Sequence, residues 1–270
     1  MTWGPEQRMQ PTLFVINLAR DVERWSWISR QLDAFAIPYQ RFNAVCPQTL
    51  HRLPADLRVR LASSPLRPGE VGCWASHLLV MQEIILRDLP YAVVLEDDVR
   101  LSADFKAALR HLGSMPQGWG LLRFAGETNR AVIPVGCFGN DPAVTLVKYG
   151  RIPMGMGAYA ISRQGATAVR RSSHVGRAAV DASFRRWWTF GLRTYGIDPL
   201  PVVHNAHGSS SIEALGGVAH IRRDGRSRLA YSLSRLPGEM ASWQFLGGAG
   251  WVKAKLSDAF PAQQPAQRSA

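Results

Sequence analysis

Two short apolar segments, with helical patterns between them, place the strongest limits on the fold of this chain. Residues 13–18 and 91–95 are apolar runs of the kind found in strands buried on both faces of a sheet. Between them, residues 21–37 carry apolar side chains on one helical stripe that ends at Pro38, and residues 68–86 form a longer helical pattern. Strands that alternate with helices predict an α/β sandwich around a largely parallel sheet.

The alternation continues to about residue 212. We expect further strands at residues 39–44, 121–124, 144–149, 157–161 and 201–203, and helices at 103–111, 162–171 and from Asp181 through Phe184, Trp187 and Trp188. Residues 52–67 predict a short helix and a loop. Residues 126–150 are rich in Gly, Pro and Asn, which indicates an active-site loop or lid that includes the strand at 144–149.

The charge balance divides the chain into two parts. The formal net charge is +12, which attracts polyanions such as nucleic acid, anionic lipid headgroups or a phosphorylated glycolipid. We predict one α/β domain at residues 1–212 and a basic, aromatic-containing extension at 213–270. The basic side chains of the extension are Arg222, Arg223, Arg226, Arg228, Arg235, Lys253, Lys255 and Arg268, interleaved with Trp243, Phe245 and Trp251. We expect this extension either to dock on the anionic inner membrane or to form a solvated basic surface.

The compartment is predicted from what the sequence lacks. No apolar run approaches the ~20 residues of a membrane span, and the first ten residues hold no run of signal-peptide type. Cys46, Cys73 and Cys137 are widely spaced and form no CxxC pair, which argues against a disulfide framework or a structural zinc site. We therefore expect a cytoplasmic protein, peripheral on the inner membrane if the extension docks there.

Three adjacent carboxylates, Glu96-Asp97-Asp98, directly follow the apolar run at 91–95. Ligands of open α/β sheets bind outside the carboxyl ends of the strands, where these acids lie. Two charges ~4 Å apart repel by about 1 kcal/mol even in bulk water. A hard divalent cation such as Mn²⁺ or Mg²⁺ is a natural counter-charge. The alternative is that the acids cap the helix beginning near Ser102 or face water.

Each of the other candidate site residues also has an explanation that is purely structural. The segment GEVGC at 69–73, followed by Ser76 and His77, opens a helix whose N–H groups would suit an anion, but His77 on an apolar stripe is also typical of a core histidine. Gly155 and Gly157 fit a tight turn equally well. Asp181 is either a catalytic base or a helix cap. His204 and His207 lie on a polar loop, where histidines are usually solvated.

Four blocks of sequence, taken in order, resemble glycosyltransferase family 25, which contains lipooligosaccharide and lipopolysaccharide biosynthesis sugar transferases. They are FVINL at 14–18 with Arg20 and Arg24, PGEVGCWASH at 68–77, VLEDDV at 94–99, and GAYAIS at 157–162 with Val180 and Asp181. The resemblance spans about residues 12–212. It implies a GT-A-like nucleotide-sugar-binding fold, a divalent cation, a UDP-sugar donor and, frequently, galactose transfer with inversion. Residues 126–150 match no such block, and the family often has a glutamine at the position of His204.

These expectations combine into one mechanism. Asp98, with Glu96 or Asp97 and a histidine from His204 or His207, would hold the cation that neutralises charge on the leaving diphosphate. The donor would contact Asn17, Leu18, Arg20, Arg24, Gly69, Glu70, Ser76, His77, Gly155 and Gly157. Asp181 would take the proton of the acceptor hydroxyl, a contribution of about 10²–10⁴-fold. The expected acceptor is a lipid-linked saccharide of a lipooligosaccharide, lipopolysaccharide or related surface glycan.

Two other functional classes stay open at this point. A non-catalytic polyanion-binding protein would explain the charge and the basic extension, although the chain has no helix-turn-helix, RNA-recognition or zinc pattern. A metal-dependent nucleotidyl or phosphoryl transferase would use the same carboxylates, although no P-loop signature is present.

Overall fold

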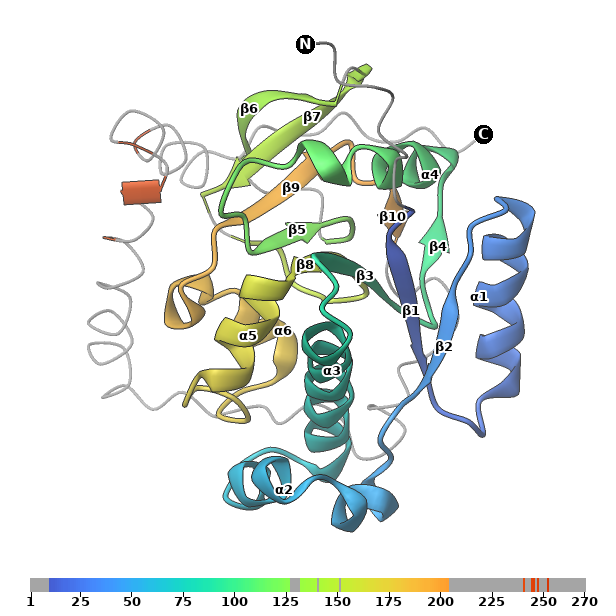
Figure 1. Ribbon diagram of the computed structural model, residues 1–270, viewed down its shortest axis with the longest axis vertical. Coiled ribbons are helices and arrows are strands. Elements are labelled where there is room, and N and C mark those ends of the chain that lie inside the picture. The colour runs from blue at the N-terminus through green and yellow to red at the C-terminus, as the bar shows by residue number, and fades with distance from the viewer. Residues whose placement is uncertain are drawn as a thin grey trace, which may run out of the picture.

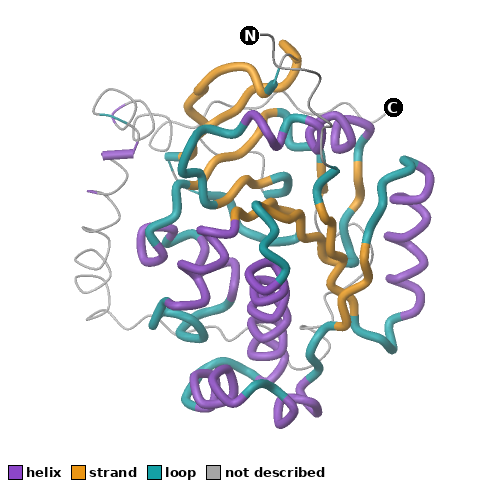
Figure 2. Tube along the Cα trace, in the orientation of Figure 1, coloured by secondary structure: helices purple, strands orange, loops and turns teal. Residues whose placement is uncertain are grey.

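The computed structural model describes residues 10–126, 132–139, 141–150, 152–203, 240, 244–245, 247 and 252. Its central feature is a sheet of eight strands in the order β2-β1-β3-β8-β5-β9-β7-β6. Their bounds are β1 Thr12–Asn17, β2 Gln40–Asn43, β3 Tyr91–Glu96, β5 Leu121–Arg123, β6 Val132–Phe138, β7 Asp141–Tyr149, β8 Ala158–Ser162 and β9 Thr194–Asp198. These strands run as a continuous band through the middle of the molecule (Figure 2).

Helices cover both faces of this band (Figure 1). The α-helices are α1 Val22–Ala34, α2 Ala55–Ala62, α3 Pro68–Leu86, α4 Ala103–Arg110, α5 Arg163–Arg171 and α6 Val180–Phe184. Short 3₁₀ segments lie at η1 Pro47–Arg52, η2 Leu112–Ser114 and η3 Trp187–Phe190. Strand β4 Arg100–Leu101 pairs with β10 Val202–Val203 in a separate two-stranded sheet. Within the described residues, no helix is both long and apolar enough to cross a membrane.

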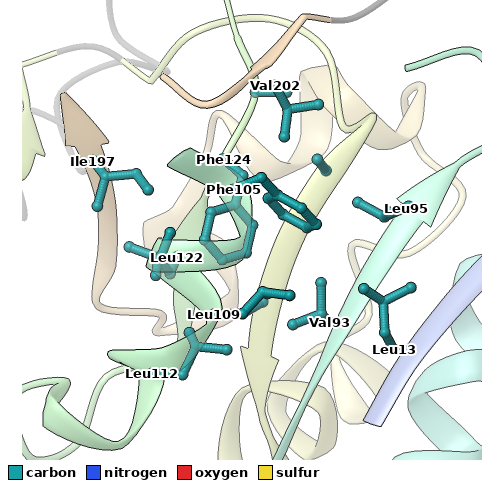
Figure 3. Packing of buried hydrophobic residues seen from close by; sticks show 14 of the residues in the cluster. Leu13, Val93, Leu95, Phe105, Leu109, Leu112, Leu122, Phe124, Ile197 and Val202 are labelled. Atoms are coloured by element: carbon teal, nitrogen blue, oxygen red, sulfur yellow. The ribbon is translucent and has the colours of Figure 1, made fainter. Parts of the chain in front are cut away.

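The alternation of side chains along the strands builds two hydrophobic cores. In β1, Leu13 and Val15 face the core that contains α1 and α4, whereas Phe14 and Ile16 face the core that contains α2, α3, α5 and α6. Successive side chains of a strand point to opposite faces, so one apolar run supplies both cores. Figure 3 shows the first core, where residues of β1, β3, β5 and α4 converge.

The prediction of an α/β fold is confirmed, but the prediction of a mostly parallel sheet is wrong. In the part of the chain that the structure describes, β1 pairs in parallel with β2 and β3, and β5 pairs in parallel with β9. The other four neighbouring pairs are antiparallel. The reversed strand β8, which lies between β3 and β5, and the hairpin of β6 and β7 make the sheet mixed.

Residues 126–150, expected to be a loop with one strand, contain two paired strands, β6 and β7, in their described part. The middle of β6 is exposed and the strand lies at the end of the sheet, where Pro134 is tolerated. A strand of this kind shows no apolar alternation. The helix expected from Asp181 is also shorter than predicted, because α6 ends at Phe184 and Trp187 begins a 3₁₀ turn.

Candidate active site

A cavity of about 120 Å³ lies at the carboxyl ends of β1 and β3, beside the first turns of α3. In the sheet, β1 lies between β2 and β3, because the chain passes from β1 to β2 on one side of β1 and then reaches β3 on its other side. The cavity therefore occupies the crevice where α/β sheets commonly bind ligands. Its lining residues are Ile16, Asn17, Leu18, Asp21, Arg24, Ala44, Val45, Pro47, Gly69, Cys73, Ser76, His77, Glu96, Asp97 and Asp98.

An arginine supplies counter-charge to two of the three acids. Arg24 Nη1 donates to Asp97 Oδ1 at 3.0 Å, and Arg24 Nη2 lies 3.5 Å from Asp98 Oδ2. Asn17 Nδ2 donates to Asp97 Oδ2 at 2.6 Å. Arg24, expected at the donor phosphates, lies against the acids, so the chain itself supplies positive charge to them.

Burial of the acids has an electrostatic cost. It raises the pKa of Asp97, while the hydrogen bond from Asn17 and the charge of Arg24 oppose the rise. Glu96 and Asp21 act in the same direction as burial, because like charges disfavour the ionised form. A site that holds carboxylates together against this cost is typical of functional clefts.

For Asp97, the geometry does not support the helix-capping alternative. Ser102 is the N-cap of α4, and the contacts of Asp97 run to Asn17 and Arg24 instead. The turn after the acids is held against α1, because Trp27 Nε1 donates to the Val99 carbonyl at 2.9 Å and Gln31 Nε2 donates to it at 3.1 Å.

Glu96, the first acid, faces α3 rather than Arg24's helix. Its Oε1 lies 3.2 Å from Nε2 of the buried His77, whose Nδ1 lies 2.8 Å from the Tyr159 hydroxyl. Cys73, one helical turn before His77, lies beside them. Burial raises the pKa of the Cys73 thiol well above its usual range, and the carboxylates of Glu96 and Asp181 add to the rise. His77 is therefore in the core, as the structural alternative held, and also at the cavity.

The start of α3 is shaped by contacts with the loop after β2. Pro68 is the first helical residue, and Glu70 accepts a hydrogen bond from the Arg67 backbone N–H at 3.0 Å, which is half of a capping box. A Cβ on Gly72 would lie 2.5 Å from the Val45 carbonyl oxygen, so only glycine permits this approach. Ser76 Oγ accepts from Val45 N and donates to the Gly72 carbonyl, each at 2.8 Å. Gly69 and Ser76 line the cavity, whereas Glu70 serves as a cap.

The segment that contains Gly155 and Gly157 lies on the other side of Glu96. The Gly157 carbonyl accepts from the Glu96 backbone N–H at 2.8 Å, and Gly155 has a positive φ of 83°. The fully buried Arg123 donates to the carbonyls of Ala125, Met154 and Gly155 and contacts the sulfur of Met156. Arg185 donates to the Ile152 carbonyl at 3.1 Å. Two arginines thus fix the segment next to the acids.

The remaining predicted residues are more distant from the cavity lining or are not described. Asp181 is in the first turn of α6, where Oδ1 accepts from the Ala182 N–H at 2.7 Å, and its charge still reaches Cys73. Arg20 lines a neighbouring cavity of about 540 Å³ together with Arg52, and the two cavities share Leu18, Ala44 and Val45. His204 and His207 lie outside the described residues.

Sequence reasoning did not assign roles to Cys73, Tyr159, Arg123 or Arg41. Arg41 donates to the Asn17 side-chain oxygen and so orients the amide that binds Asp97. The i,i+4 spacing of Cys73 and His77 was a usable signal, because that spacing puts both side chains on one helical face. No local pattern could have indicated the contact of Tyr159 with His77, or those of Arg123 with Met154 and Gly155, because these partners are distant in sequence.

Comparison with known proteins identifies relatives of this region. The sequence pattern of glycosyltransferase family 25 (LPS biosynthesis protein) matches residues 10–131. The lacto-N-neotetraose biosynthesis glycosyltransferase LgtE of Neisseria meningitidis is 37% identical over 92 residues, which are 33% of each chain. Procollagen galactosyltransferase 1-A of Xenopus laevis is 31% identical over 117 residues, 40% of this chain and 19% of that protein.

Two further matches limit what the similarity carries. The inactive glycosyltransferase 25 family member 3 of mouse is 35% identical over 109 residues, 37% of this chain and 18% of that protein. Mouse xyloside xylosyltransferase 1 aligns over 68% of this chain and 77% of its own with a TM-score of 0.35 and 10% identity, too weak a likeness to support an argument.

The match thus spans about a fifth of the length of the animal relatives and about a third of the Neisseria protein. Every residue that lines the cavity falls within the matched region. The similarity of this chain to glycosyltransferase family 25, predicted from its motifs, is confirmed over residues 10–131.

Proposed function

We propose that this chain is a metal-dependent glycosyltransferase that transfers galactose from UDP-galactose, with inversion, to a lipid-linked saccharide of a bacterial surface glycan. The observation that carries the proposal is the cluster of Glu96, Asp97 and Asp98 at the carboxyl ends of β1 and β3, inside the region that matches the family. The family's description as an LPS biosynthesis protein supports a surface-glycan acceptor, and the name of the Xenopus relative, a procollagen galactosyltransferase, supports galactosyl transfer. The mouse relative named inactive makes a direct assay essential.

The chemistry of the acids suits a hard divalent cation, because Mg²⁺ and Mn²⁺ prefer oxygen ligands. Both oxygens of Asp97 already accept hydrogen bonds, from Asn17 and Arg24. We therefore assign Asp98 and Glu96 as the main protein ligands, with His204 or His207 as further candidates. When bound, the cation would neutralise the charge that develops on the departing diphosphate.

The chain's own residues would bind and orient the substrates. Arg24 sits against the acids, and Arg20 lines the adjoining cavity, so both guanidinium groups are placed for phosphate oxygens, which they can bind bidentately. Asn17 and Leu18 line the cavity at the end of β1, where we assign the nucleoside. The cavity itself is too small for a whole nucleotide sugar, so the sugar and the acceptor would extend out of it.

Asp181 is our candidate for the base that removes the proton of the acceptor hydroxyl. It lies in the first turn of α6, within electrostatic reach of Cys73 in the cavity wall. Asp181→Asn should retain donor binding and lose turnover by about 10²–10⁴-fold. Unchanged turnover would leave Asp181 as a helix-end residue alone.

The decisive test of the proposal combines binding and product analysis. Purified protein would be screened by thermal shift against nucleotide sugars with Mn²⁺ or Mg²⁺, and UDP release would be measured with saccharide acceptors. Asp98→Asn should abolish transfer while the protein stays folded, and Asp104→Asn, an exposed acid on α4, is the matched control. Full activity of Asp98→Asn, or full activity in excess EDTA, would refute metal dependence. Release of pyrophosphate instead of UDP would indicate a nucleotidyl transferase.

We also propose that the basic side chains of residues 222–235 dock the enzyme on the anionic inner membrane, with roughly 1 kcal/mol for each cation near the surface. These residues lie outside the described part of the chain. Phe245, further along, packs against Trp187 and Tyr195, so truncation after residue 212 would also remove core contacts. Replacing Arg222, Arg223 and Arg226 with Gln is the cleaner variant. It should bind anionic vesicles less at low salt and still use water-soluble acceptors, and equal vesicle binding would contradict docking.

A further inference from the structure

Three side chains with different ligand atoms meet in one wall of the cavity. The sulfur of Cys73, a ring nitrogen of His77 and a carboxylate oxygen of Glu96 all lie within 4.8 Å of one another. Cys73 and His77 are one turn apart on α3, and Glu96 ends β3. All three line the cavity, so a ligand in it reaches them together.

The hydrogen bonds of His77 orient its ring for such a role. Nδ1 contacts the hydroxyl of the buried Tyr159 at 2.8 Å, which leaves Nε2 directed at Glu96 Oε1, 3.2 Å away. When Nδ1–H donates to the hydroxyl, Nε2 carries a lone pair that faces a carboxylate. Metal-binding histidines are held in this way, with the outer nitrogen donating to a fixed acceptor and the inner nitrogen free to bind the ion.

The charges around the three side chains also suit a cation. The carboxylates of Glu96, Asp181, Glu70 and Asp98 all act electrostatically on the Cys73 thiol. Arg24 forms its ion pairs with Asp97 and Asp98, on the side of the cavity that belongs to α1. Four carboxylates thus act on the thiol, and the buried Arg123, which interacts with Glu96 and Asp181, balances part of this negative charge.

We propose that Cys73, His77 and Glu96 form a binding site for a thiophilic divalent cation, Zn²⁺, with its fourth position open to the cavity. Sulfur, imidazole and carboxylate are the protein ligands that zinc prefers, and three of them with one open position is the usual pattern of a reactive zinc site. Mg²⁺ does not favour thiolate. Zinc coordination releases the thiol proton to solvent. This site goes beyond the proposed function, shares only Glu96 with the oxygen ligands assigned there, and does not depend on sugar transfer.

Cobalt provides a direct test because Co²⁺ occupies zinc sites and a cobalt–thiolate bond has a charge-transfer absorption in the near ultraviolet. The full chain, stripped of metal, should show this band, saturate at one equivalent of Co²⁺ and lose the band when Zn²⁺ is added. Cys73→Ser should lack the band, and Cys73→Ala is the second variant if the serine protein folds poorly. Cys46→Ser and Cys137→Ser, which remove the other free thiols, should retain it.

The other ligands give graded outcomes. His77→Ala and Glu96→Gln should each weaken Co²⁺ binding at least tenfold, whereas Asp98→Asn should leave the band intact. Absence of the band in the wild-type protein, or its survival in both Cys73 variants, would overturn the proposal. Because the absorption is measured without any sugar donor, a missing band with normal transfer rejects the zinc site alone, and a normal band without transfer rejects the enzyme function alone.

Discussion

The cavity and the segment at residues 154–157, which contacts Glu96, hold buried charge in two different ways. At the cavity, Arg24 meets the carboxylates of Asp97 and Asp98, so charge is balanced by opposite charge. Behind Glu96, the guanidinium of Arg123 is fully buried and donates to backbone carbonyls of Ala125, Met154 and Gly155. There, charge is balanced by dipoles.

The difference separates a replaceable partner from a fixed one. Under the proposed function, a cation would take the place of Arg24 beside the acids, and a donor phosphate would take the place of the acids beside its guanidinium. The carbonyls around Arg123 belong to the chain itself and have no substitute in solution. Burial lowers the pKa of Arg123. Its hydrogen bonds connect β5 to the segment at residues 154–157, whose Gly157 carbonyl accepts from the Glu96 backbone N–H. We expect the first region to respond to ligands and the second to respond only to mutation.

The largest effect should follow from Arg123→Met. The variant leaves several buried carbonyls without their donor, and removing one partner of a buried charged network typically costs about 3–5 kcal/mol. We expect a loss of this size in the free energy of unfolding measured with urea, and no recovery with Mn²⁺. Arg123→Lys keeps the charge but not the planar fork, and should recover part of the loss. A stable methionine variant, or one that Mn²⁺ restores, would break the distinction between the two regions.

A smaller effect is expected for Arg24→Ala. Arg24 is 15% exposed at the cavity, so solvent reduces the loss to about 1–2 kcal/mol. Mn²⁺ should raise the thermal midpoint of this variant more than that of the wild type, because the ion supplies the missing counter-charge. Arg20→Ala is the matched control, because the Arg20 side chain is 51% exposed and its Nε lies 3.7 Å from Asp21 Oδ1. Equal responses to Mn²⁺ in all three proteins would show that Arg24 is not exchangeable.

The smallest effect at neutral pH is expected for Tyr149→Phe. Burial raises the pKa of Tyr149 to about 12, and its hydroxyl has no hydrogen-bond partner in the described part of the chain. The folded state therefore keeps this proton longer than the unfolded state, whose phenol titrates near 10. Wild-type stability should fall by about 3 kcal/mol from this group as pH rises from about 10 to 12.

The phenylalanine variant should lack that part of the alkaline loss. At neutral pH it should be equal to the wild type or more stable by about 1 kcal/mol, because no buried hydroxyl is left unsatisfied. Urea unfolding of both proteins across this pH range measures the difference, in which groups common to both cancel. A parallel pH dependence in the two proteins would contradict the raised pKa.

Local patterns predicted β1, β3 and α3 well because each has a periodicity complete within its own segment. They also predicted that the acids after β3 would lie at the ligand-binding edge of the sheet. The mixed sheet escaped prediction because the direction of β8 depends on which strands it pairs with, not on its own composition. The role of Arg24 escaped for a similar reason, since Asp97 lies 73 residues away along the chain.

The close approach of Gly72 to Val45 has a consequence for the timing of ligand capture. In the folded protein, the hydrogen bonds of Ser76 hold α3 against the loop after β2, and Gly72, which has no Cβ, allows the two to pack closely. The conformational entropy of this wall is thus lost during folding, and none of it opposes association. A ligand that enters should bind in a single kinetic phase whose rate rises linearly with ligand concentration, with no slower ordering of the loop at residues 44–47.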